Sequence, residues 1–222
     1  QSLRIVDQLE KNGEGLNLTW EVRQGIVSHS KPRGDFLDTS LTDGLTLEGQ
    51  VCRISDAIAY LNHDLADAFR AGILSQDTLP AQVATELGTK HSERVNTMVC
   101  DIVESSWAAS GSLPSDNEMP PAIGMSPRIG QAVTSLREFM FQNVYLPEDR
   151  SEEGLAAHRI VRLLHHYYID NDSEIPPEYR LTSESTEKSS VDFVSGMTDR
   201  YALRIAEKIQ PGIAKIFYSR LL

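Results

Sequence analysis

Apolar residues recur every three or four positions through most of the chain, the spacing that places them on one side of an α-helix. The clearest run covers residues 46–72. Its apolar side chains share one stripe: Val51, Ile54, Ile58, Leu61, Leu65 and Phe69. No segment shows the alternation typical of a β-strand. The pattern therefore predicts an all-α fold organised around this helix.

The same period predicts shorter and longer helices on both sides of the central one. They cover residues 2–11, 17–29, 79–87, 92–109, 126–147, 152–171 and 190–210. Asn17 and Thr46 are expected to cap the two helices that follow them, and Pro147 to end the helix before it. The polar segments between the later helices, including the acidic residues 171–189, are expected to be loops.

One side of the central helix carries a polar row, in which Asp56, Tyr60 and Asp64 are spaced four residues apart. This spacing stacks their side chains one turn above another. Two carboxylates with an aromatic ring between them suit a cation, a sugar hydroxyl and the face of a sugar. The alternative is an acidic face in solvent, and periodicity alone does not separate the two.

Composition limits the classes of function. The chain has 222 residues, 40% of them apolar, and a net charge of −11. An acidic chain without a basic stripe is not a general nucleic-acid binder. Cys52 and Cys100 form no CxxC pair and are expected to be reduced thiols of a cytoplasmic protein. The chain begins with Gln, and its first residues resemble the middle of a helix, which predicts a fragment or a chain whose front end was removed.

Several long strings resemble one family. LEGQVCRISDAIAYLNHDLADAFRAGIL, QSLRIVDQLE, LNLTWEVRQGIVSHS and GMTDRYAL are similar to strings of the bacterial deoxyguanosine triphosphate triphosphohydrolase-like proteins of the HD superfamily. The resemblance implies a helical HD-superfamily fold. Residues 1–110 would be the C-terminal part of the catalytic domain, 111–125 a loop, and 126–222 a helical region packed on the active site.

The resemblance also implies roles for the polar row. Asp56 would be a ligand of a divalent metal such as Mn²⁺ or Mg²⁺, Tyr60 would pack against the deoxyribose, and Asp64 would accept from its 3′-hydroxyl. The family's other metal ligands, and the His and Glu that support water attack, are not in this sequence. We therefore expect no catalytic residue in the chain, and no metal bound by this fragment alone. The dipeptide His63-Asp64 is interpreted as unrelated to the family's His-Asp metal motif.

Three further residues are candidates for substrate binding. Lys31 lies in a basic turn where, as the resemblance implies, basic or aromatic residues lie near the phosphates, although a solvated loop accounts for it equally well. In GMTDRYAL, Arg200 is a candidate phosphate ligand and Tyr201 a candidate for the base, whereas structural ion pairs are the alternative for Arg200.

The expected parent protein hydrolyses a deoxynucleoside triphosphate to deoxynucleoside and triphosphate through a metal-activated water. It is expected to form homo-oligomers, to have a possible regulatory nucleotide or single-stranded DNA as partner, and to lack a membrane segment. Two alternatives stay open. One is a non-catalytic helical module that binds a nucleotide or a partner, and the other is an HD phosphohydrolase acting on nucleoside monophosphates or cyclic nucleotides.

Overall fold

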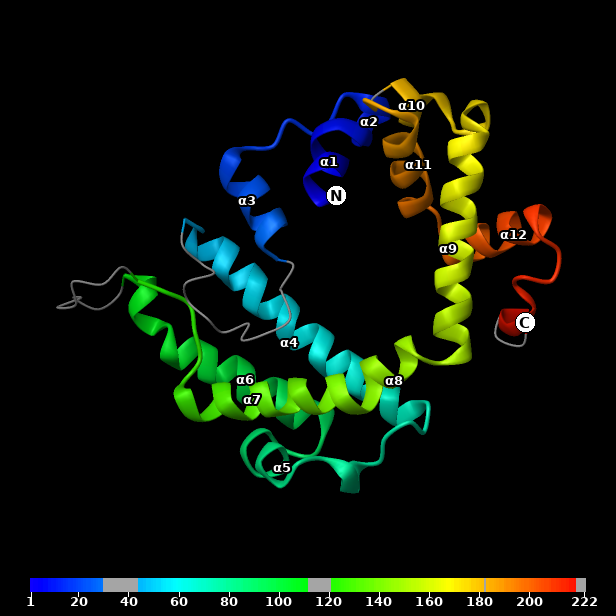
Figure 1. Ribbon diagram of the computed structural model, residues 1–222. Helices are drawn as coiled ribbons and strands as arrows, with labels where there is room; N and C mark the ends of the chain where they lie inside the picture. Colours follow the sequence, from blue (N-terminus) through cyan, green and yellow to red (C-terminus); the bar gives the residue numbers. More distant parts are fainter. Residues whose placement is uncertain (30–43, 112–120, 182, 219–222) are drawn as a thin grey trace. The chain divides into compact units, whose positions relative to one another are not determined.

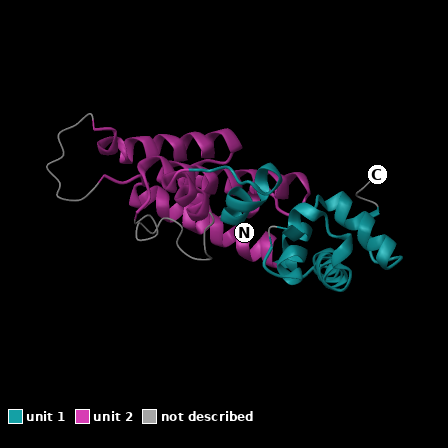
Figure 2. Cartoon of the chain, turned by 90° about the horizontal axis from the view of Figure 1, so that it is seen from above, with its two compact units in different colours: residues 1–18, 147–222 teal, residues 19–146 magenta. Residues whose placement is uncertain are grey.

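The structure, a computed structural model, describes residues 1–29, 44–111, 121–181 and 183–218. These residues are helical, with no β-strand among them, so the prediction of an all-α fold is confirmed (Figure 1). None of the described helices combines the length and apolarity that a bilayer crossing needs. The chain divides into two compact units (Figure 2). Unit 1 contains residues 1–18 and 147–222, and unit 2 contains residues 19–146. The sequence divided the chain by expected role instead, and that division stays a prediction.

Unit 2 is built around the long helix α4. Its helices are α3 Trp20–Ser28, α4 Leu47–Arg70, α5 Ala81–Leu87, α6 His91–Ser105 and α7 Pro127–Met140, with short 3-10 turns at Gln76–Thr78 and Trp107–Ser110. Thr46 caps α4 as predicted, because its side-chain oxygen accepts from the N–H of Gly49 at 3.2 Å. The cap of α3 is Thr19 and not Asn17, whose φ of +50° is left-handed. Asn is among the few residues that adopt this conformation readily, so here it turns the chain before the helix begins.

The core of unit 2 contains much of the stripe expected for α4. Ile54, Ile58, Leu61 and Leu65 are buried, and Phe69 packs against them. The other helices supply the rest of this core: Leu79, Val83, Leu87, Met98, Ile129, Ala132, Val133, Leu136 and Met140. The apolar period of residues 46–72 therefore placed most of the buried side of α4 correctly.

Pro147 does not end the helix that begins at Pro127. After α7 the chain forms one π-helical turn, Phe141–Tyr145, in which the N–H of Leu146 reaches the carbonyl oxygen of Phe141. A further turn, α8 Leu146–Asp149, contains Pro147 near its start. The helical conformation therefore continues without a break from Pro127 to Asp149, through the π-helical turn and past Pro147.

Unit 1 joins the two ends of the chain. Its elements are α1 Ser2–Arg4, the π-helical turn Ile5–Leu9, α2 Glu10–Gly13, α9 Glu152–Asp170, α10 Pro177–Leu181, α11 Thr186–Ser195 and α12 Asp199–Ile209, with 3-10 turns at Asp172–Glu174 and Lys215–Phe217. The expected helix 190–210 is two helices. Gly196 caps α11, and Thr198 caps α12 by accepting from the N–H of Tyr201. The expected loop 171–189 contains α10 and the start of α11.

A buried carboxylate holds the first residues of the chain within unit 1. Asp192 in α11 is 1% exposed and accepts from Arg4 Nε at 2.6 Å, Gln1 Nε2 at 2.7 Å and Ser183 Oγ at 3.1 Å. Burial acts to raise the pKa of Asp192, but these hydrogen bonds outweigh it and hold the pKa below its ordinary value. Helices α1 and α11 are therefore joined by an ion pair and a hydrogen bond.

Candidate functional site

The predicted polar row lies on α4, on the side away from the core stripe. Asp56 and Asp64 are half-buried, while the ring of Tyr60 is 65% exposed. The helix places the three side chains on one face, as their spacing of four residues requires. All three belong to unit 2, so this arrangement does not depend on unit 1. Whether a substrate lies against the row stays a prediction.

Asp64 has a partner from a distant part of unit 2. The hydroxyl of Tyr145 donates to Asp64 Oδ2 at 2.6 Å, a short bond to a charged acceptor. Burial is the main cause that raises the pKa of Tyr145, and the adjacent Asp64 raises it further. Tyr145 therefore stays protonated and keeps donating. The sequence analysis missed this residue, because Tyr145 shared no motif with Asp64.

A metal site is not complete within the described residues. No three His, Cys, Asp or Glu side chains among them come together as metal ligands. One carboxylate does not hold a divalent cation tightly. Asp56 thus stays a predicted ligand, and the described residues do not fit a metal on their own.

Arg53 is a second residue that the sequence analysis missed. It lies one turn before Asp56 and is only 5% exposed. Its Nη1 donates to the carbonyl oxygen of Ser28 in α3, but Nε and Nη2 find no acceptor among the described residues. Burial lowers the pKa of this guanidinium. The sequence feature that could have identified Arg53 is its charge, one helical turn before the polar row.

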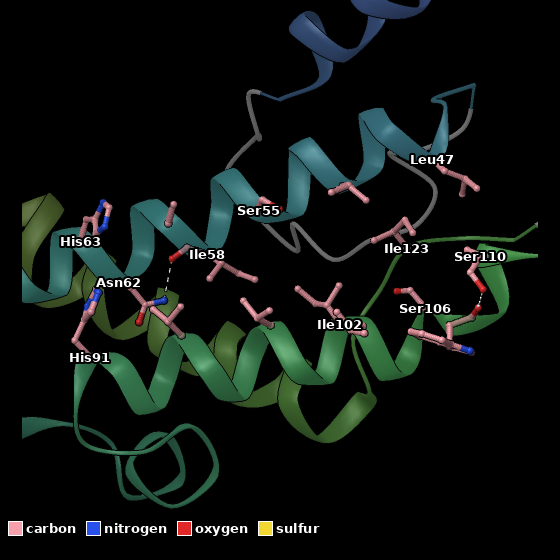
Figure 3. Close-up of a pocket in the computed structure, with 17 residues that line it drawn as sticks. Leu47, Ser55, Ile58, Asn62, His63, His91, Ile102, Ser106, Ser110 and Ile123 are labelled. Carbon is pink, nitrogen blue, oxygen red and sulfur yellow. Dashed lines mark hydrogen bonds between the residues drawn. The ribbon is translucent and has the colours of Figure 1, made fainter. Parts of the chain in front are cut away.

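A cavity of about 650 Å³ opens between α4 and α6 (Figure 3), and the polar row is not part of its lining. Its walls are mostly apolar, and several large apolar side chains are exposed there, including Val51 of the predicted stripe: Val51 45%, Val99 48%, Val103 48% and Trp107 53%. Periodicity placed them on the apolar faces, but these faces of α4 and α6 are wider than the packed core. At one end, the rings of His63 and His91 stack 5.8 Å apart. His63 therefore faces this cavity.

The remaining predicted residues lie elsewhere. Lys31 falls outside the described residues. Arg200 and Tyr201 lie in α12 of unit 1, whereas the α4 row belongs to unit 2, so their part in one substrate site stays a prediction. Arg200 lines a hollow of about 490 Å³ together with Arg204 and Lys208. The Arg204 guanidinium lies 5.2 Å from the centre of the Tyr201 ring.

Comparison with known proteins shows which proteins the chain is similar to. Residues 123–208 match the phosphohydrolase-associated domain. A deoxyguanosinetriphosphate triphosphohydrolase-like protein of Caldanaerobacter subterraneus subsp. tengcongensis is 39% identical over 208 residues, 91% of this chain and 55% of the relative. Proteins of the same name from Clostridium perfringens (strain 13) and Bordetella pertussis are 39% and 30% identical, over 94% and 92% of this chain and 58% and 62% of their own lengths. Over most of its length the chain is thus similar to deoxyguanosinetriphosphate triphosphohydrolase-like proteins, and it spans 55–62% of the length of these relatives.

Proposed function

We propose that this chain supplies the sugar-binding face and one metal ligand of a deoxynucleoside triphosphate triphosphohydrolase. The observation that supports the proposal is the row of Asp56, Tyr60 and Asp64 on the side of α4 away from the core, in a chain homologous to proteins of that name. The chain spans 55–62% of the compared relatives, so the activity is proposed for the complete protein.

Each residue of the row has a chemical role in this proposal. The Asp56 carboxylate supplies one oxygen ligand to a divalent cation. The exposed ring of Tyr60 packs against the deoxyribose, where an added 2′-hydroxyl would collide with it. Asp64 accepts a hydrogen bond from the 3′-hydroxyl. The proposed products are a deoxynucleoside and intact triphosphate.

The experiment compares Asp56→Ala with wild type in the complete protein, using deoxynucleoside triphosphates with Mn²⁺ or Mg²⁺. Changes next to a metal ligand commonly cost 10–100-fold, so losing the ligand itself should lower turnover by more than about 100-fold. Asp67→Ala is the matched control, because Asp67 lies on the same helix, is exposed and pairs with Arg70. Chromatography of the products separates triphosphate from pyrophosphate or phosphate. Full activity in Asp56→Ala would contradict the assignment.

A second candidate function is a non-catalytic module that binds nucleotide without turnover. Such a module would need only the sugar contacts proposed for Tyr60 and Asp64 on α4. Saturable binding of a deoxynucleoside triphosphate by the complete protein, with no product released in the presence of either metal, would support the module instead.

A further inference from the structure

We propose that Tyr145 is a positioning residue of the sugar site: its hydroxyl fixes Asp64 Oδ2 and leaves Oδ1 to accept the 3′-hydroxyl of the substrate. The inference rests on the proposed function, and it adds the residue that determines recognition of that hydroxyl. The bond of 2.6 Å joins helix α4 to the π-helical turn Phe141–Tyr145, and both lie in unit 2.

The ring of Tyr145 is held from its own turn. Phe141 contacts it edge to face, with 5.1 Å between ring centres and 76° between ring planes. The Arg137 guanidinium in turn lies 5.3 Å from the centre of the Phe141 ring. Tyr145 is also partly buried and packs against the core of unit 2. These contacts restrict the position of the Tyr145 ring, so its hydroxyl is held next to Asp64.

The π-helical turn sets this direction. A π turn adds one residue relative to an α turn, which rotates the side chains that follow, and such turns are frequent at functional sites. In an unbroken α-helix through residues 127–149, Tyr145 would point about 100° away from its present direction. The extra residue thus brings the hydroxyl to α4.

The hydrogen bonds of Asp64 leave one oxygen available. Tyr145 occupies Oδ2, and no donor among the described residues reaches Oδ1. A carboxylate with one oxygen fixed by a permanent donor keeps a defined plane, so Oδ1 presents its lone pairs in a set direction. Because Tyr145 stays protonated, this arrangement does not change with pH in the neutral range.

The test uses the complete protein and two nucleotides, a 2′-deoxynucleoside triphosphate and its 2′,3′-dideoxy analogue, which lacks only the 3′-hydroxyl. Wild type should show a higher kcat/KM for the deoxy compound. Tyr145→Phe should lower the ratio of the two kcat/KM values by about tenfold, the scale of one hydrogen bond to a charged group. The kcat/KM for the dideoxy compound should stay within about twofold. Thermal unfolding of each variant checks that it folds.

Tyr167→Phe is the matched control, because the Tyr167 hydroxyl also donates to a carboxylate, Glu174, at 2.9 Å, but in unit 1. It should leave the ratio unchanged. Phe141→Leu keeps the Tyr145 hydroxyl but removes its edge-to-face support, and should lower the ratio by about threefold. If Tyr145→Phe fails to fold, Phe141→Leu tests the inference in its place.

The outcomes separate the two proposals. Hydrolysis of the deoxy compound with an unchanged ratio in Tyr145→Phe, or with equal losses on both nucleotides, overturns the role of Tyr145 and leaves the proposed function standing. A wild-type protein that hydrolyses neither nucleotide overturns the proposed function, and this inference with it. A ratio that falls in Tyr145→Phe but not in Tyr167→Phe supports the inference.

Discussion

Arg53 combines a buried charge with two N–H groups that have no acceptor among the described residues. Each buried donor left without a partner costs about 1–3 kcal/mol, and replacing buried charge by an apolar side chain of similar volume is often neutral or stabilising. The guanidinium nevertheless holds the end of α3 through the carbonyl oxygen of Ser28. Arg53 therefore lowers the local stability of the fold one turn before Asp56, the proposed metal ligand.

We expect Arg53→Met to raise the free energy of unfolding by about 1 kcal/mol, because the relief of the unpaired donors exceeds the lost bond to Ser28. Urea denaturation measures the change. Arg70→Met is the control: Arg70 is exposed and pairs with Asp67 on the surface, so its change should stay within about 0.5 kcal/mol. A loss of stability in Arg53→Met would contradict the account.

At the residue scale, the sequence predicts which side chains one helix places on the same face. It does not predict contacts between side chains of two different elements. Asp56, Tyr60 and Asp64 follow from a spacing of four on α4. Tyr145 does not, because its contact with Asp64 crosses 81 positions and depends on a π-helical turn that no periodicity reveals. Asp192 shows the same limit, since its partner Arg4 lies near the other end of the chain.

At the scale of the elements, helix starts are set by side chains that the sequence shows. Ser126 caps α7 by accepting from the N–H of Ile129, and its own hydroxyl and N–H donate to the two carboxylate oxygens of Asp101 at 2.6 and 2.9 Å. Ser151 caps α9 through a single bond from the N–H of Gly154. One cap therefore links two helices, while the other serves only its own.

Ser126→Ala should cost about 2 kcal/mol of unfolding free energy, since it removes both a cap and a hydrogen bond to a carboxylate. Ser151→Ala should cost about 1 kcal/mol, the usual value of a cap. Chemical denaturation of both variants measures the difference. Equal losses would show that the bond from Ser126 to Asp101 adds nothing.

Helices were easier to predict than their interruptions. The starts at Thr46 and Ser126 carry recognisable caps, and the structure has them. The break between α11 and α12 was missed, because the apolar period continues across Gly196 and Thr198. The exposure of apolar side chains on α4 and α6 was also not predicted, because the sequence pattern does not show how much of an apolar face a neighbouring helix covers.

At the scale of the whole molecule, unit 1 depends on an ion pair between the two ends of the chain. Arg4→Ala leaves the Asp192 carboxylate buried without its cation, and breaking a buried pair costs about 3–5 kcal/mol. Hydrogen exchange should therefore show lost protection in α9 and α11, while α4 and α7 of unit 2 keep theirs. Uniform loss across both units would contradict the division.

The same pair predicts how stability depends on pH. The pKa of Asp192 is lowered in the folded state, so its contribution is present above the unfolded value of about 3.9 and is lost as the pH falls through the lower folded value. Unfolding followed from pH 6 to pH 2 should show this loss in wild type. Asp192→Asn should remove this part of the pH dependence.

The matched phosphohydrolase-associated domain, residues 123–208, contains α7 from unit 2 and α9 to α12 from unit 1, but not Arg4. A recombinant fragment of residues 123–208 would contain Asp192 without its partner Arg4. It would also contain α7 without the other helices of unit 2 that pack on it. Recombinant fragments intended to fold alone should instead follow residues 19–146, or join residues 1–18 to 147–222 through an engineered linker. The segment that sequence comparison recognises as one inherited module thus coincides with neither of the two compact units of the structure.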